Sequence, residues 1–121
     1  MIRRAEEIKS VDFEGFKGGV GRTTMRDLMD AEAMGGHGRK FGLTCVAPGA
    51  SIGTHFHRGE SEAWYVLSGT GRFNDDGTWQ DFAPGDFLYC ADGHCHGLQN
   101  TGDKPVEMVA LILNALAPSK R

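Results

Sequence analysis

Short segments in which apolar and polar residues alternate recur along the chain from Arg22 onward. They follow the two-residue period of a β-strand with one buried face. Pro-Gly and Asp-Gly pairs separate several of them and suit the backbone angles of tight turns. Nine strands are expected, over residues 23–28, 40–47, 51–57, 61–68, 70–74, 78–82, 86–90, 94–101 and 106–113. The pattern predicts an all-β sandwich or barrel in which strands pair with near neighbours.

Two parts of the chain depart from this pattern. Residues 1–21 carry charges and glycines without a sustained period, so we expect an irregular N-terminal arm. Residues 27–34 are the best candidate for a helix, but the Gly35-Gly36 pair limits it to one or two turns. A barrel over 22–114 and a C-terminal tail over 115–121 complete the expected organisation.

Composition narrows the classes of protein. The 121 residues leave room for one core, because single domains usually hold about 100 to 150 residues. The 18 glycines fit a chain with many turns. A formal charge of −3 gives no general attraction to nucleic acid or to anionic membranes. Three cysteines, Cys45, Cys90 and Cys95, lack metal-finger or redox spacing and are interpreted as reduced thiols.

The chain shows no targeting or membrane signal. The N-terminal residues are charged and lack the apolar stretch of a secretion signal. The longest apolar run, over 108–118, is far shorter than the roughly 20 residues that span a bilayer. We therefore expect a soluble, cytoplasmic protein.

Two clusters of glycine and histidine carry the candidate chemistry. The first comprises Gly49, His55, His57, Glu62 and Gly69. The second comprises Gly85, Ala91, Gly93, His96 and Asn100. In order and spacing these residues resemble the two sequence motifs of the cupin superfamily. The second departs from the family pattern at Ala91, where proline is usual, but this removes no ligand.

The resemblance implies a double-stranded β-helix, also called a jelly-roll barrel, with a metal bound inside. The implied ligands are His55, His57, Glu62 and His96. The implied cofactor is a divalent transition metal: Fe, Mn, Zn, Ni or Cu.

The spacing of these residues independently supports a shared site. Alternate side chains of a strand point to one face, so His55 and His57 can converge on one ion. Glu62 opens the next strand, whereas His96 must arrive from a strand distant in sequence, which a barrel allows. Three imidazoles and one carboxylate suit a transition metal better than Ca²⁺ or Mg²⁺, and octahedral coordination leaves two positions open. The alternatives are a solvated histidine pair and a barrel that holds no ion.

Three further residues, Trp64, Tyr89 and His94, are candidates for a substrate pocket. Trp64 shares strand parity with Glu62, but ordinary core filling is the favoured interpretation of its side chain. The Tyr89 hydroxyl could act as an acid near the metal. His94 shares parity with His96, and the alternative is a hydrogen-bonded turn histidine.

The sequence does not identify the general base of a catalysed reaction. Its candidates are Arg58, Glu60, Tyr89 and His94. A basic group, His37, Arg39 and Lys40, could receive a carboxylate or phosphate, and solvated side chains are the simpler alternative.

These observations favour a metalloenzyme that acts on a small polar substrate. Among the reactions that the resemblance implies, a dioxygenase is preferred to an isomerase, epimerase, decarboxylase or lyase. The alternative is a noncatalytic module that binds or senses a small ligand through its metal. A homodimer is expected, because the strands at 23–28 and 106–113 would otherwise leave open edges.

Overall fold

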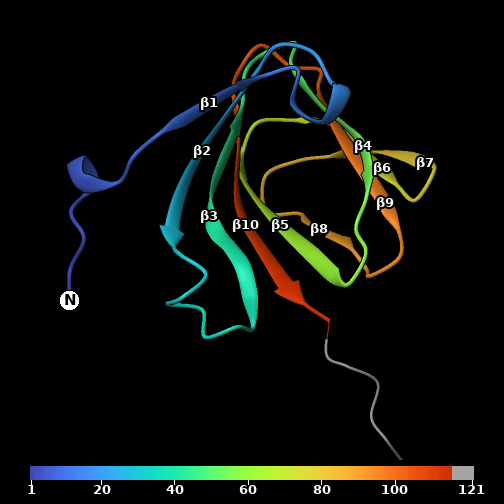
Figure 1. The fold of residues 1–121 in the computed structure, drawn as a ribbon. Helices are drawn as coiled ribbons and strands as arrows, with labels where there is room; N and C mark the ends of the chain where they lie inside the picture. Colours follow the sequence, from blue (N-terminus) through green and yellow to red (C-terminus); the bar gives the residue numbers. More distant parts are fainter. Residues whose placement is uncertain (116–121) are drawn as a thin grey trace, which may run out of the picture.

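The computed structural model describes residues 1–115, and these residues form an almost entirely β structure (Figure 1). The strands are β1 (Val11–Glu14), β2 (Arg22–Met29), β3 (Gly38–Val46), β4 (Ser51–Phe56), β5 (Glu60–Ser68), β6 (Gly71–Asp75), β7 (Thr78–Phe82), β8 (Phe87–Cys90), β9 (Cys95–Asn100) and β10 (Val106–Asn114). Two short 3₁₀ turns, η1 (Ala5–Glu7) and η2 (Phe16–Gly18), flank β1. None of the described helical segments has the length and hydropathy to cross a membrane.

The strands form two antiparallel sheets that face each other (Figure 1). One sheet has six strands in the order β1-β2-β3-β10-β5-β8, and the other has four in the order β4-β9-β6-β7. Neighbouring strands such as β4 and β9 are far apart in the sequence, which is typical of a jelly roll. Strand pairing does not continue from one sheet into the other within residues 1–115, so the expected barrel is an open sandwich.

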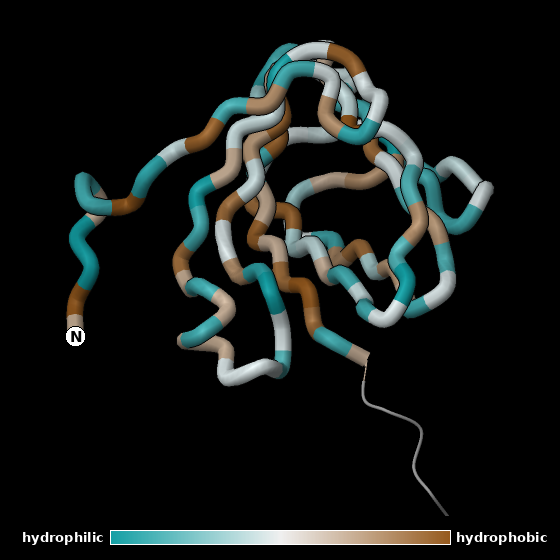
Figure 2. The backbone as a smooth tube through the Cα atoms, viewed as in Figure 1, coloured by the Kyte–Doolittle hydropathy of each residue, from teal (hydrophilic) through white to brown (hydrophobic). Residues whose placement is uncertain are grey.

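The core lies between the sheets and follows from the alternation of side chains. Along β10, Val106, Met108 and Ala110 are fully buried, whereas Glu107 is exposed. From the other sheet, Leu98 is fully buried in the same hydrophobic cluster. Figure 2 shows hydrophobic and hydrophilic positions interspersed along most strands, whereas residues 108–113 of β10 are apolar throughout. This two-layer core holds inward-facing side chains of both sheets in fixed positions.

The strand expectations are confirmed, with ends that differ by two residues at most. The helix expected at 27–34 is wrong, because β2 continues to Met29 and turns follow over 31–36. Cys45, Cys90 and Cys95 are free thiols, and burial raises the pKa of Cys90 to about 11. Apart from Ala115, the expected C-terminal tail over 115–121 lies outside the described residues.

The N-terminal segment also differs from the irregular arm that we expected. Its strand β1 pairs with β2 from Val11 opposite Met25 to Glu14 opposite Arg22. β1 is therefore the edge strand of the larger sheet. All four of its residues are exposed. Its apolar and polar residues alternate over only four positions, 11–14, which is too short a pattern to predict a strand in a charged, glycine-rich segment.

Candidate metal centre

Three histidines and one glutamate meet between the two sheets. His55 lies on β4, His57 directly follows that strand, and His96 lies on the neighbouring β9. Glu62 reaches them from β5 in the facing sheet. One ligand atom of each residue lies within 4.8 Å of those of the other three. The pairing of β4 with β9 thus brings together histidines that the sequence separates widely.

The four converging atoms are the Nε2 atoms of the histidines and Oε1 of the glutamate. His57 Nε2 lies 3.0 Å from Glu62 Oε1 and 3.0 Å from His96 Nε2. His96 Nε2 lies 3.2 Å from His55 Nε2 and 3.2 Å from Glu62 Oε1. Two ligands at right angles, each about 2.1 Å from an ion, are about 3 Å apart. These separations fit ligands that share a single transition metal ion.

Hydrogen bonds outside the cluster orient two of the rings. His55 Nδ1 donates to the Gly53 carbonyl oxygen at 2.7 Å, and His57 Nδ1 donates to Glu60 Oε2 at 2.5 Å. Because both partners are acceptors, they assign the proton to Nδ1 in each ring. Each neutral ring then directs an Nε2 lone pair into the cluster. Lone pairs at this separation repel each other unless a cation lies among them, so the donor set fits a bound metal.

Arg39 holds the carboxylate that supports His57. Its Nε and Nη2 donate to Glu60 Oε1 and Oε2 at 2.7 and 2.8 Å. The hydrogen bond from Arg39 is the main reason that the pKa of Glu60 lies below its usual range, and the bond from His57 adds to it. A carboxylate behind a metal-ligating imidazole fixes the ring and increases its basicity. Arg39 is therefore engaged in the support of the cluster.

Burial and hydrogen bonding act in opposite directions on the acid of the cluster. Burial alone would raise the pKa of Glu62, but hydrogen bonds from His57 and His96 outweigh it and lower the pKa to about 2. The bond to Glu62 raises the pKa of His57, whereas burial lowers the pKa of His55. In the absence of an ion, His57 is thus the ring that keeps a proton most readily.

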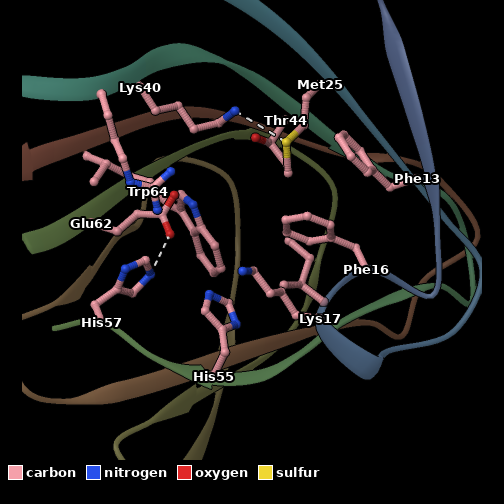
Figure 3. Close-up of a pocket in the computed structure, with 13 residues that line it drawn as sticks. Phe13, Phe16, Lys17, Met25, Lys40, Thr44, His55, His57, Glu62 and Trp64 are labelled. Carbon is pink, nitrogen blue, oxygen red and sulfur yellow. Dashed lines mark hydrogen bonds and ion pairs between the residues drawn. The ribbon is translucent and has the colours of Figure 1, made fainter. Parts of the chain in front are cut away.

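A cavity of about 270 Å³ opens beside the cluster (Figure 3). His55, His57 and Glu62 line one end of it. The remaining lining residues are Phe13, Phe16, Lys17, Met25, Arg39, Lys40, Thr44, Ile52, Trp64 and Ile112. Pockets for drug-sized ligands usually measure about 300–1,000 Å³, so this cavity suits a smaller molecule.

Comparison with known proteins identifies the family. The family model described as a cupin domain matches residues 42–112, which include both motifs and all four cluster residues. The chain belongs to the cupin family. This confirms both the resemblance and the fold that the motifs implied.

Two matches from Thermotoga maritima, one by sequence and one by structure, resemble this cupin over most of its length. One, named oxalate-binding protein, is 35% identical over 113 residues, which are 93% of each chain. A crystal structure described as a predicted oxalate decarboxylase has a TM-score of 0.90 at 35% identity and covers 94% of this chain and 99% of that chain. The polyketide cyclase RemF of Streptomyces resistomycificus shares the fold, with a TM-score of 0.71 at 23% identity over 98% of this chain and 83% of that one.

In this cupin, Trp64 both lines the cavity and fills the core. Its side chain is buried, and its indole ring stacks on the imidazole of His96 with centroids 4.2 Å apart and planes 19° apart. The ring therefore helps to fix the orientation of His96, and both interpretations of Trp64 from the sequence hold together.

Tyr89 and His94 lie away from the cavity, contrary to the expectation from the sequence. Tyr89 is half-exposed on the outer face of β8, where its ring stacks on Phe87. His94 is exposed in the turn before β9, and its Nδ1 lies 2.8 Å from Asp76 Oδ2. His94 does not point to the same face as His96, because β9 begins only at Cys95 and the alternation of side chains along the strand does not include residue 94. The hydrogen-bonded turn histidine is the alternative that matches the structure.

The other basic residues considered from the sequence also contact side chains outside the four-residue cluster. Lys40 Nζ lies 3.0 Å from Asp27 Oδ1, and Arg39 is bound to Glu60. The guanidinium of Arg58 lies over the exposed ring of Phe56. None of these arrangements places a free base at the cluster.

Sequence reasoning missed the wall that faces the cluster. Phe13, Phe16 and Lys17 belong to the N-terminal segment, and the rings of the two phenylalanines lie 5.1 Å apart between centroids. Two aromatic residues in an otherwise charged and glycine-rich segment are the signal that could have revealed it.

Proposed function

We propose that this cupin binds a divalent transition metal through His55, His57, Glu62 and His96 and uses it to bind a small carboxylate of the oxalate class. The convergence of the four ligand atoms within 4.8 Å carries the proposal. The names of the two Thermotoga maritima matches support the class of ligand.

The residues of the cavity have separate tasks in this proposal. When bound, the ion supplies a Lewis acid at the end of the cavity, with open positions for a ligand oxygen. One charged carboxylate, Glu62, among neutral imidazoles leaves a divalent site with net positive charge, which favours an anion. The apolar side chains of Trp64, Phe16 and Ile52 exclude water from the cavity and strengthen that attraction.

The residues that line the cavity favour ligand binding without turnover. The only carboxylate that lines it is Glu62, and within residues 1–115 no tyrosine or cysteine lines it. A general acid or base is thus lacking beside the cluster, apart from the lysines. The noncatalytic module is accordingly the first candidate, and dioxygenase or decarboxylase activity stays a prediction from the sequence and the relatives.

Titration calorimetry of the full chain tests this function. We expect the metal-loaded protein to bind oxalate and the chelator-treated protein to bind none. Equal binding by both forms would contradict a metal-dependent site. Release of formate and carbon dioxide from oxalate would replace the binding module by a decarboxylase, and oxygen uptake with a panel of acids and phenols would favour the dioxygenase.

A homodimer and a cytoplasmic location remain predictions. The outer face of β5 and β8 supports the dimer, since Tyr65, Leu67, Phe87 and Tyr89 are all roughly half-exposed or more on it. Contiguous apolar patches of this kind often mark protein interfaces. Light scattering at micromolar concentration should give twice the mass of one chain, and the mass of one chain would contradict the dimer.

A further inference from the structure

Lys17 lies at the mouth of the cavity, on the η2 turn of the N-terminal segment. It lines the same cavity as His55, His57 and Glu62. Figure 3 shows its side chain extending from η2 into the cavity on the side of His55. The residue as a whole is exposed, so a ligand that enters the cavity passes its ammonium group.

The backbone of Lys17 adopts a conformation that lysine rarely takes. Its φ is 56° and its ψ 31°, which is the left-handed region. Only one other non-glycine residue among those described, Asp76, has a positive φ, and aspartate tolerates that region better than lysine. Glycine would fill position 17 with less strain, as Gly15 and Gly18 do beside it. A strained residue at the mouth of a site points to a role for its side chain.

Glycine contacts fix the η2 turn against the strand that carries His55. A Cβ atom at Gly53 would collide with the carbonyl oxygen of Lys17, and one at Gly19 would collide with the carbonyl oxygen of Ser51. Gly53 is also the residue whose carbonyl oxygen accepts the hydrogen bond from His55 Nδ1. The turn that positions Lys17 and the strand that orients a cluster ligand therefore touch through their backbones.

The charges of the cavity single out Lys17 among its cations. Arg39 is paired with Glu60 and Lys40 with Asp27, at 2.7 and 3.0 Å. Lys17 forms no ion pair within residues 1–115, and its Nζ lies over the ring of Phe16, 5.6 Å from the ring centroid. Its charge is therefore not neutralised by a carboxylate of these residues.

A second polar group of the cavity also lacks a partner. Thr44 lines the cavity from β3 and is 2% exposed, and its hydroxyl has no hydrogen-bond partner among the described residues. Buried hydroxyl groups are nearly always hydrogen-bonded in proteins. The Thr44 hydroxyl is thus a buried polar group in the wall of the cavity, without a partner within residues 1–115.

We propose that Lys17, aided by the Thr44 hydroxyl, binds the second carboxylate of a dianionic ligand whose first carboxylate lies at the metal cluster. This inference rests on the proposed function and deepens it by naming the residue that selects the ligand. Small dicarboxylates engage both positive centres, whereas monocarboxylates such as formate engage only the cluster. Lys17 is therefore a specificity-determining residue of the site.

Calorimetry of the metal-loaded full chain tests this inference with oxalate and formate. We expect Lys17→Met to weaken oxalate binding by about 10-fold or more, because a charge-assisted hydrogen bond is lost. Formate binding should change by less than about 3-fold, since formate has no second carboxylate. Lys17→Arg should retain oxalate binding, and Lys104→Met, which removes an exposed lysine outside the cavity, should match the parent.

The controls separate this inference from the proposed function. Metal content and thermal melting of each variant verify that the cluster and the fold are intact. Unchanged oxalate binding in a metal-loaded Lys17→Met protein would overturn the role of Lys17 and leave the proposed function standing. Failure of the metal-loaded parent to bind oxalate would overturn both. Thr44→Val gives an independent check, with a smaller loss expected for oxalate.

Discussion

The two walls of the cavity are built in different ways. The metal wall, made of His55, His57, Glu62 and His96, projects from paired strands, and three of these residues are buried. The outer wall, made of Phe13, Phe16 and Lys17, belongs to a segment in which neither β1 nor η2 has a buried residue. Sheet register fixes the first wall, whereas backbone contact at Gly19 and Gly53 fixes the second. The ligand-selecting wall can therefore change while the metal wall stays intact.

Among the substitutions that distinguish the two walls, His57→Ala should have the largest effect. The substitution removes a ligand and leaves Glu62 with only one of the two histidine hydrogen bonds that keep its buried carboxylate charged. Elemental analysis should find about one ion per chain in the reconstituted parent and almost none in the variant. Lys17→Met should retain the ion. Equal metal content in the His57→Ala protein would contradict the assignment of the metal wall.

Acidity should act on the metal wall in a defined direction. Its bond to Glu62 raises the pKa of His57 above 6.5, while burial lowers the pKa of His55 below 6.5. Below the raised pKa, an incoming ion must displace the proton that His57 holds, and Glu62 stays ionised down to about pH 2. Metal affinity should therefore rise about tenfold per pH unit until His57 deprotonates, and then level off.

Titration with a transition metal between pH 5 and 8 measures this slope. Lys17→Met provides the control, because the outer wall carries no ligand and should leave the slope unchanged. A metal affinity independent of pH over this range would contradict a site whose histidines bind as neutral rings.

A smaller effect is expected from Glu60→Gln, which alters the support behind the metal wall. The glutamine removes the charge that His57 Nδ1 meets at 2.5 Å, and Arg39 loses its ion pair. Loss of such a supporting carboxylate typically costs about 10- to 100-fold in metal affinity. Competition with a chelator measures it. Unchanged affinity would show that Glu60 only anchors Arg39.

The smallest expected effect is on the outer wall and concerns folding. Lys17→Gly relieves the left-handed strain, and the greater freedom of glycine in the unfolded chain offsets part of that gain. The free energy of unfolding of the metal-free protein should rise by roughly 0.5 kcal/mol. Urea denaturation measures the change, and oxalate binding should weaken at the same time, as it does in Lys17→Met. A clear loss of stability would contradict the strain assigned to this turn.

The metal wall could be predicted from the sequence because its four ligands lie in two short sequence motifs. His55 and His57 lie two residues apart at the end of one strand, and the glycine-bounded motifs supplied Glu62 and His96. The prediction that His94 lines the pocket also used this local pattern. It failed because it assumed that β9 begins before Cys95.

Register and edge strands explain what the sequence could not reveal. Glu62 lies opposite Cys90 and Ala63 lies opposite Tyr89, so Tyr89 faces outward. The residue pattern within β8 alone does not predict this pairing, because the register depends on the neighbouring strand. The outer wall was missed for another reason. β1 is exposed along its whole length, and the place of the segment is set by the pairing of β1 with β2 and by contacts of the η2 turn with β4, which only the folded chain provides.

Anomalous diffraction from crystals grown with a transition metal would locate the ion itself. One strong peak is expected between the two sheets, about 2.0–2.3 Å from the Nε2 atoms of the three histidines and from Glu62 Oε1. Absence of a peak among these atoms at saturating metal, or a peak at the surface histidine His94 instead, would contradict the proposed metal site.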